Sequence, residues 1–416
     1  MHTRRIFLRN SALAMVGVGA APLWLRRALC ATDAPSPRKK VLVAIFLRGA
    51  ADGLNIVVPH AEKRYYELRP TIAVPRPSRA TGATEDAAID LDGFFGLHPA
   101  LAPLKPVWDR GHLAIIHAAG SPDPTRSHFD AQDFMESGTP GCKSTSDGWM
   151  NRAEGTAAGP VSPVRLISMG AVLPLTVAGP NPATAIESLR AFEVRNPEAA
   201  TAFQAAYAHT SDPLLRAAGR ETFEAVSLLQ SVERQPYQPA AGASYPSGRL
   251  GDSLRQIAQL IKANVGVEMA FADVGGWDHH LNEAGARASD GQLANRLADL
   301  SQALAAFWID LGDRAADVAV VTMSEFGRTA RENGGRGTDH GHANCMFVMG
   351  GGVRGGKVYG AWPGLEQEQL YEGRDLSLTT DFREVLAELV KVQSGNHDLS
   401  NVFPDYEPKL HHILKA

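Results

Sequence analysis

The chain has 416 residues, of which 44% are hydrophobic and 21% are charged, so it can bury a full core as one large domain or two modest ones. The formal net charge is −4. This mildly acidic balance argues against electrostatic binding of nucleic acid, but it does not exclude small anions, which a metal ion or an arginine can bind locally.

The first 31 residues carry five arginines and no acid, and they predict a twin-arginine signal peptide. Arg4 and Arg5 in TRRIFLR precede the weakly apolar run SALAMVGVGAAPLWL. That run is short and carries two glycines, so no stable transmembrane segment is expected. We therefore expect export through the twin-arginine translocase, cleavage near residues 30–34, and a periplasmic or secreted protein. The alternative is an amphipathic anchor or the start of a cytosolic helix.

Cysteine is sparse. Cys30 leaves with the signal if cleavage falls after it, and Cys142 and Cys345 remain. In an oxidising compartment these two could pair, although their distance in the fold cannot be derived from the sequence. There is no C-x-x-C motif, which argues against iron–sulfur and thiolate-zinc sites.

After a linker at residues 32–38, apolar runs alternate with helical patterns. Strands are predicted at residues 39–47, 112–120 and 164–170, and later in VGVEMAFADV, ADVAVVTMS and ANCMFVMGG. Helices are predicted at residues 99–108, 127–137, 214–233, 249–263, 292–311 and 379–392. This alternation predicts that residues 39–416 form a single α/β domain, with a doubly wound, mostly parallel sheet sandwiched by helices.

Three other stretches lack this rhythm. Residues 69–96 and 234–247 are rich in turn formers and predict surface loops. GGVRGGKV, residues 351–358, has the glycine and lysine spacing of a phosphate-binding loop. It lacks the following Ser or Thr, and no helix pattern follows, so we interpret it as a glycine-rich loop or hairpin.

Polar residues follow the predicted strands, and in a parallel sheet the carboxyl ends of the strands are where ligands bind. Asp52 comes shortly after the first strand and is a candidate metal ligand, or alternatively a turn residue. In GGWDHH, Asp278 and His280 stand two apart and share a face if the segment is extended, so they could hold one ion. The alternative there is an N-cap aspartate beside a solvated histidine pair.

SEFGRT and TDHGH supply the remaining metal candidates. Glu325 could ligate the ion and Arg328 could clamp an oxyanion, or the two could form a structural pair next to a capping serine. The TDHGH segment offers Asp339, His340 and His342 after a glycine-rich loop.

Ser127 stands at the predicted start of a helix in PDPTRSHFDAQDFMESG. A helix N-terminus stabilises developing negative charge, so Ser127 is a candidate nucleophile beside the metal. Thr125 and water are the alternative nucleophiles, and His128 and Asp130 are possible contributors. A simple N-cap serine explains the same pattern.

Taken together, FLRGAADGLNIVVP, FGLHPALAPL, RSHFDAQDFMESG, GGWDHH, SEFGRT and TDHGHANCMFVMGGGVRGGKVYG resemble an exported bacterial family of unknown function, number 1501. That family is similar to the sulfatase and alkaline phosphatase superfamily. The resemblance implies an alkaline-phosphatase-like α/β fold with metal ions at the carboxyl edge of the sheet. It also implies that Asp52 is the first-strand metal aspartate, that Asp278 and His280 are the middle ligand pair, and that His340 or His342 is the late histidine.

The expected function is metal-dependent hydrolysis of phosphate or sulfate esters in the periplasm. One or two divalent ions, zinc, manganese or calcium, would act on a small anionic ester. No C-x-P-S-R or S-x-P-S-R motif is present, so a formylglycine sulfatase is not expected. The alternative is a catalytically inactive relative that binds or assembles a component of the cell envelope.

Overall fold

The computed structural model describes residues 39–77, 86–154, 162–191 and 197–415. The predicted signal peptide, its cleavage region with Cys30, and the linker lie outside these residues. Cys142 and Cys345 are both free thiols, the first exposed and the second buried.

A nine-stranded sheet forms the centre of the described part of the chain. Its order is β11-β5-β10-β9-β1-β8-β6-β7, with β12 paired to β5. The strands are β1 (Val41–Leu47), β5 (Leu113–Gly120), β6 (Leu166–Met169), β7 (Thr184–Ile186), β8 (Met269–Val274), β9 (Val318–Met323), β10 (Asn344–Gly350), β11 (Lys357–Tyr359) and β12 (Thr380–Asp381).

The sheet is mixed and mostly parallel. The central strand β1 pairs in parallel with β8 and β9, so that Leu47 lies beside Val274, and Phe46 beside Met323. Among the described strands of this sheet, β10 alone runs the other way, since it is antiparallel to both β5 and β9. The sequence prediction of an α/β fold with a mostly parallel sheet is therefore confirmed, and the sheet contains one antiparallel strand that the sequence did not predict.

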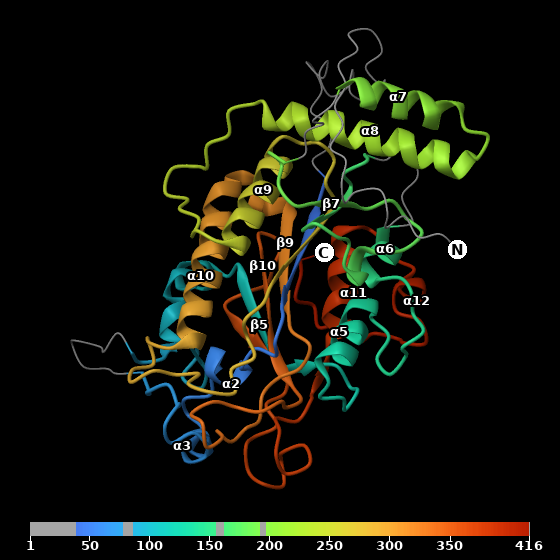
Figure 1. The fold of residues 1–416 in the computed structure, drawn as a ribbon. Coiled ribbons are helices and arrows are strands. Elements are labelled where there is room, and N and C mark those ends of the chain that lie inside the picture. The colour runs from blue at the N-terminus through green and yellow to red at the C-terminus, as the bar shows by residue number, and fades with distance from the viewer. Residues whose placement is uncertain (1–38, 78–85, 155–161, 192–196, 416) are drawn as a thin grey trace.

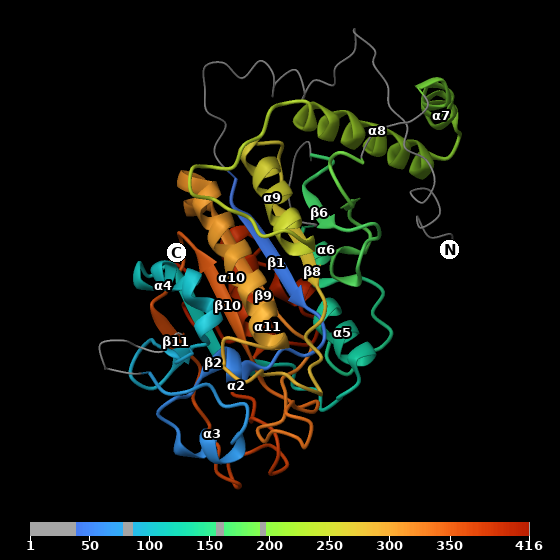
Figure 2. The same cartoon turned by 60° about the vertical axis from the view of Figure 1, so that its left-hand side comes forward.

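Helices cover both faces of this sheet (Figures 1 and 2). Alternate residues of β1 enter the two cores: Val43 and Ile45 pack on one side, and Ala44 and Phe46 on the other. The first core also takes the apolar side chains of α8, α9 and α10, and the second takes those of α6 and α11. Since both faces are buried, the strands read as continuous apolar runs, which is why they could be located in the sequence.

The described helices are α2 (Gly53–Ile56), α3 (Lys63–Leu68), α4 (Lys105–Asp109), α5 (His128–Ser137), α6 (Trp149–Glu154), α7 (Pro197–His209), α8 (Pro213–Glu233), α9 (Arg249–Lys262), α10 (Gln292–Leu311), α11 (Phe382–Gln393) and α12 (Leu399–Val402). Short 3₁₀ segments are Pro99–Leu104, Leu175–Val177 and Gly312–Asp317. Membrane crossing would need a longer and more apolar helix than any of those in the described residues.

Most predicted helices are confirmed, with two differences. The helix expected at residues 99–108 is a 3₁₀ segment followed by the short helix α4, because Pro103 and Pro106 interrupt regular helical hydrogen bonding. The helix expected from residue 379 begins at Phe382, where Asp381 caps it. The GGVRGGKV stretch contains turns and then β11, which pairs with β5, so its interpretation as a loop is confirmed.

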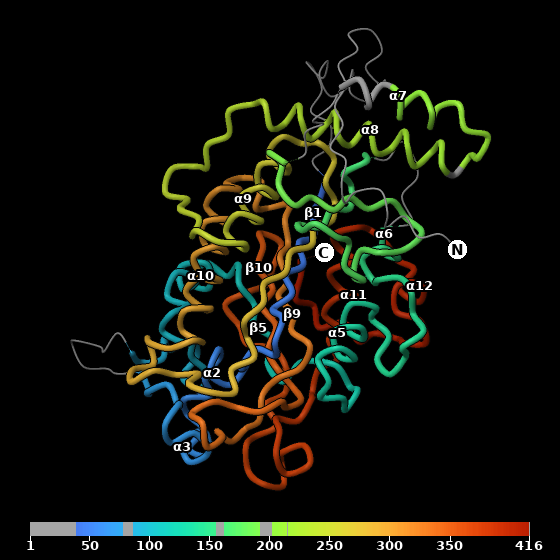
Figure 3. Tube along the Cα trace, viewed as in Figure 1, coloured from blue at the N-terminus to red at the C-terminus, as the bar shows by residue number. Residues whose placement is uncertain are grey.

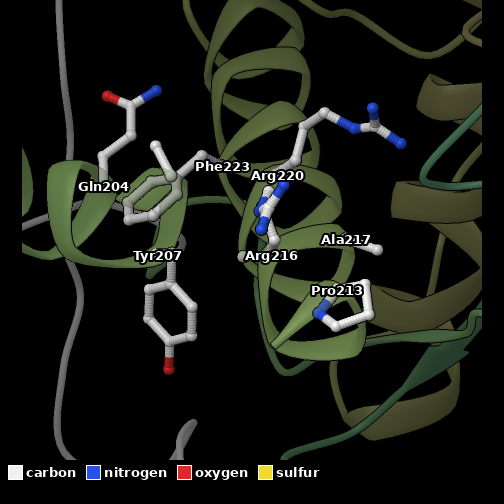
Figure 4. Close-up of a pocket in the computed structure, with 9 residues that line it drawn as sticks. Gln204, Tyr207, Pro213, Arg216, Ala217, Arg220 and Phe223 are labelled. Carbon is white, nitrogen blue, oxygen red and sulfur yellow. The ribbon is translucent and has the colours of Figure 1, made fainter. Parts of the chain in front are cut away.

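Two smaller units flank the large sheet. Strands β2 (Val57–Val58), β4 (Gly96–Leu97) and β3 (Ile89–Asp90) form a separate three-stranded sheet. The α7–α8 hairpin lies at the end of the molecule opposite α3 (Figure 3). Between its helices is a hollow of about 400 Å³, lined in part by Tyr207, Arg216, Arg220 and Phe223 (Figure 4).

Candidate metal centre

The topology brings five distant segments to one edge of the sheet. The parallel strands β1, β8 and β9 end at the same edge, and β5 runs in the same direction as they do. The arrowhead of β1 in Figure 2 points to this edge, toward α2. Because β10 is antiparallel, the residues that precede it lie at the same edge. The polar segments after β1, β5, β8 and β9 and the TDHGH segment before β10 therefore meet.

Three side chains there form a group able to hold a metal ion: His128, Asp278 and His340. One ligand atom from each lies within 4.8 Å of the others. The Nε2 atoms of His128 and His340 are 3.0 Å apart. Asp278 Oδ2 is 3.4 Å from Nε2 of His128, and Asp278 Oδ1 is 3.3 Å from Nε2 of His340. Three elements of the fold thus contribute one ligand each.

His280 adds a third imidazole to this group. Its Nε2 lies 3.0 Å from Nε2 of His340 and 3.0 Å from Oδ1 of Asp278. Asp278 and His280 stand two apart in an irregular segment after β8, where the N–H of His280 donates to the carbonyl oxygen of Asp278 at 3.2 Å. The two side chains converge through this turn, and not through the extended backbone on which the sequence prediction depended.

Each of the three histidines has an acceptor at its other ring nitrogen. Nδ1 of His128 lies 2.9 Å from Oε1 of Glu325, Nδ1 of His280 lies 3.0 Å from Oδ1 of Asp339, and Nδ1 of His340 lies 2.9 Å from the carbonyl oxygen of Arg126. An acceptor at Nδ1 fixes the proton there, and in a neutral imidazole this leaves Nε2 as an unprotonated lone pair. The lone pairs that converge are therefore the ones a metal needs.

The spacing fits a small divalent cation. Tetrahedral zinc with bonds of about 2.0–2.1 Å has ligand atoms about 3.3 Å apart. The contacts that join these side chains in pairs are 3.0 to 3.4 Å long, and the three whose ligand atoms all lie within 4.8 Å of one another are His128, Asp278 and His340. Without a cation or a bridging proton, two Nε2 lone pairs 3.0 Å apart repel each other. Imidazole and carboxylate suit zinc and manganese, whereas calcium prefers a shell made of oxygen.

Asp278 is held in place by Arg328. Nη1 of Arg328 donates to Oδ1 of Asp278 at 2.7 Å, while Nε donates to Oγ1 of Thr338 at 3.1 Å and Nη2 to the carbonyl oxygen of Thr338. The Arg328 side chain is fully buried. Burial opposes ionisation of Asp278, but Arg328 outweighs it and lowers the pKa of that carboxyl. All three guanidinium nitrogens are thus used within the protein.

Glu325 is a buried carboxylate that contacts the ring nitrogen of His128 facing away from the metal group. Its Oε1 accepts from the backbone N–H of Gly49 at 2.8 Å and from Nε2 of Gln132 at 3.1 Å, in addition to His128. Burial opposes its ionisation, but the hydrogen bond from His128 and the backbone donors hold its pKa below the ordinary value. A Cβ on Gly49, whose φ is +120°, would stand 2.7 Å from the backbone nitrogen of Asp278. Only glycine therefore fits at position 49, where the backbone that donates to Glu325 passes close to Asp278.

Asp52 lies outside the group and forms a buried ion pair with Arg69. Nη2 of Arg69 donates to Oδ1 of Asp52 at 2.9 Å, and Nη1 donates to Oδ2. Burial alone would favour the neutral acid, but Arg69 outweighs it and lowers the pKa of Asp52. Both carboxylate oxygens are thus engaged by one guanidinium.

The other two metal candidates lie beside the group. Asp339 contacts it only through Nδ1 of His280. His342 is buried and stacks on Tyr371, with ring centroids 4.3 Å apart, and burial lowers its pKa. Of the seven metal candidates from the sequence, the structure therefore brings together Asp278, His280 and His340.

Ser127 is the N-cap of α5. Its side-chain oxygen accepts from the backbone N–H of Asp130 at 3.5 Å, and its own N–H donates to Oγ1 of Thr125. The capping alternative considered for Ser127 is what the structure contains. His128 is the first residue of the same helix, so the capped helix start aims His128 at the metal group.

Several contributors were missed or underrated at the level of sequence. His128 was considered only as a helper of Ser127, and Arg69, Arg126 and Glu283 were not considered. A histidine directly after an N-cap serine is a usable signal for His128. Two large apolar side chains next to ligands also stand exposed, Phe129 at 87% and Leu281 at 63%.

Comparison with known proteins adds the family but no activity. No curated protein matches the sequence. The family described as "Protein of unknown function (DUF1501)" matches residues 39–402, which includes every residue of the candidate metal centre. The chain belongs to the DUF1501 family.

Proposed function

We propose that this protein is an exported, metal-dependent hydrolase of small phosphate or sulfate esters that works in the periplasm. The single observation that carries the proposal is the convergence of three imidazole Nε2 atoms on the carboxylate of Asp278, with an acceptor at every Nδ1. A divalent cation bound there supplies Lewis acidity: it neutralises charge on ester oxygens and makes water a stronger nucleophile.

The protein's own residues have two further roles, binding the cation and orienting its ligands. His128, His280, His340 and Asp278 hold the cation, and Glu325 and Asp339 orient two of the imidazoles. The group is accessible: the side chain of His280 is 40% exposed and that of Asp278 is 42% exposed. A substrate can therefore reach the cation directly.

We assign the nucleophile to water rather than to Ser127. The Ser127 oxygen is used as the cap of α5. A bound divalent cation would lower the pKa of its water enough for that water to lose its proton near neutral pH. Arg328 is a positioning residue that holds Asp278, because its nitrogens are all engaged. The exposed Phe129 and Leu281 would contact the apolar part of the ester.

The test is hydrolysis of p-nitrophenyl phosphate, bis(p-nitrophenyl) phosphate and p-nitrophenyl sulfate by protein stripped and reloaded with zinc, manganese or calcium. At least one metal–ester pair is expected to turn over. His340→Ala should abolish that activity and Ser127→Ala should keep it. His411→Asn is the matched control, since His411 pairs with a carboxylate, Glu384, away from the site.

A second candidate is a metal-dependent binding protein for a cell-envelope component. It is favoured by the engagement of Arg328 and Arg69 in internal pairs, which leaves neither to clamp a substrate anion. Metal binding without hydrolysis of any ester in the panel would select this candidate and end the hydrolase proposal.

A further inference from the structure

A second group of polar side chains, four of them ionisable, lies buried behind the metal centre. It consists of Asp52, Arg69, Glu283, Thr338 and Arg328, each at most 2% exposed. Asp52 and Arg69 form the ion pair already described. Glu283, which follows the GGWDHH segment, stands beside Asp52 and is fully buried. The proposed hydrolase does not use this acid in its chemistry.

The two oxygens of Glu283 have different surroundings. Oε2 accepts a hydrogen bond from Oγ1 of Thr338 at 2.8 Å. Oε1 is buried without a donor among the described residues, and burial together with the charge of nearby Asp52 raises the pKa of Glu283. Two neighbouring buried carboxyl groups disfavour a second negative charge, which favours one proton for the pair.

The position of that proton follows from Arg69. Both oxygens of Asp52 receive hydrogen bonds from the Arg69 guanidinium, which keeps the negative charge on Asp52. Burial and the charge of Asp52 raise the pKa of Glu283 well above its ordinary value. A proton on Glu283 would make its side chain a donor beside the charged Asp52, and the buried Oε1, which has no donor, is the oxygen free to carry it.

From Glu283 the hydrogen bonds continue to a metal ligand. The Thr338 hydroxyl has one proton and donates it to Glu283, so its lone pair is free to accept from Nε of Arg328 at 3.1 Å. Nη1 of Arg328 then donates to Oδ1 of Asp278 at 2.7 Å. Three hydrogen bonds thus connect the buried acid to the carboxylate of the metal centre.

We propose that Glu283 is kept as a neutral carboxylic acid that donates to Asp52 and, through Thr338 and Arg328, positions Asp278 for the metal. The charged groups facing Glu283 are Asp52 and Arg69, with Arg328 beyond Thr338. A neutral acid suits this place because an added charge would leave two adjacent carboxylates with one close guanidinium. The role of Glu283 as a positioning residue rests on the proposed metal site, whereas its protonation does not.

The first experiment is infrared spectroscopy at pH 8, where ordinary carboxyls are ionised. The difference spectrum of wild type minus Glu283→Gln should show the C=O band of a protonated carboxylic acid. Asp310→Asn is the matched control, because Lys262 pairs with buried Asp310 at 2.8 Å and, against the effect of burial, helps to hold its pKa below the ordinary value, so its difference spectrum should lack the band. Absence of the band for Glu283 overturns the proposal.

The pH dependence of folding stability is a second test of whether Glu283 carries a proton. A raised pKa in the folded state means that folding retains a proton which the unfolded chain loses above pH of about 4.5. Wild type should therefore lose stability relative to Glu283→Gln as pH rises from 5, by about tenfold in the unfolding equilibrium constant per pH unit. Parallel pH profiles for the two proteins would contradict the proposal.

Metal titration tests the positioning role. The amide that Glu283→Gln introduces can donate to Asp52 and accept from Thr338, so this variant should keep the zinc Kd within about threefold, while Thr338→Val should weaken it about 10–100-fold. Equal Kd values for wild type and Thr338→Val overturn the positioning role. If the wild-type protein shows the carboxylic-acid band but binds no metal, the protonation of Glu283 is confirmed. The proposed metal-dependent function is then wrong.

Discussion

Nδ1 of His128 lies 2.9 Å from Oε1 of Glu325, although the two residues are 197 positions apart in the chain. His128 begins a helix after β5, and Glu325 follows β9, so the contact exists because both strands end at the same edge of the sheet. The hydrogen bond that Nδ1 of His128 donates to Glu325 is the main cause of the raised pKa of His128. A carboxylate behind a ligand histidine both fixes its tautomer and raises its basicity toward a metal.

We expect Glu325→Gln to weaken metal binding by about 10–100-fold, the usual effect of removing an outer carboxylate. The buried amide keeps the shape of the side chain but loses its negative charge. Isothermal titration of apo protein with zinc measures the change. Glu384→Gln, which alters the carboxylate partner of His411, serves as control, and its Kd should match wild type. Equal Kd values for Glu325→Gln and wild type would refute the role given to Glu325.

Arg69→Met should destabilise the fold by about 3–5 kcal/mol, because it leaves the charge of Asp52 buried without its cationic partner. Denaturant unfolding followed by circular dichroism measures the loss. Arg64→Met is the control, since Arg64 pairs with Glu67 at the surface and its removal should change little. A loss no larger than that of the control would show that Asp52 is not charged in the fold.

The parts of the fold that the sequence predicts are those set by local patterns. Buried strands are continuous apolar runs, and the polar segments that follow them mark one edge of the sheet, so the approach of Asp278 and His280 to His340 could be expected. The pairing of Asp52 with Arg69, by contrast, depends on how α3 packs, and the sequence between them contains no periodic pattern. The orientation of β10 likewise could not be derived, since an apolar run carries no direction.

Acidification should destabilise the fold through His98 and His117. Burial lowers the pKa of each to about 4, whereas an unfolded histidine titrates near pH 6.5. Between these values the unfolded chain binds more protons, so the contribution of these two histidines to stability is complete above about pH 6.5 and falls as pH drops toward 4. The slope of unfolding free energy against pH measures this effect.

Substituting the two histidines should flatten that slope. His98→Asn preserves the acceptor for the N–H of Ala100, and His117→Gln preserves the donor to the carbonyl oxygen of Val57. The double variant should show a shallower slope between about pH 4.5 and 6.5 than its parent, whatever its absolute stability. The exposed His397→Gln gives the control slope. An unchanged slope in the double variant would mean that these histidines are not buried as neutral bases.

Replacing the exposed apolar residues beside the ligands should weaken substrate binding and leave metal binding unchanged. Phe129→Ser with Leu281→Ser is expected to raise KM for an aryl ester about fivefold, the effect of losing roughly 1 kcal/mol of apolar contact. The zinc Kd should stay within about twofold. Ile309→Ser, on the exposed side of α10, is the control. An unchanged KM would leave both side chains without a part in substrate binding.

The most direct test of the account is the metal content of protein purified without chelator, measured by plasma mass spectrometry beside a His128→Ala/His340→Ala variant. We predict about one zinc or manganese ion per chain in the wild type and none in the variant, with both folded by circular dichroism. Wild-type protein that is folded and remains metal-free after zinc and manganese are added would contradict the assignment of His128, Asp278, His280 and His340 as a metal centre.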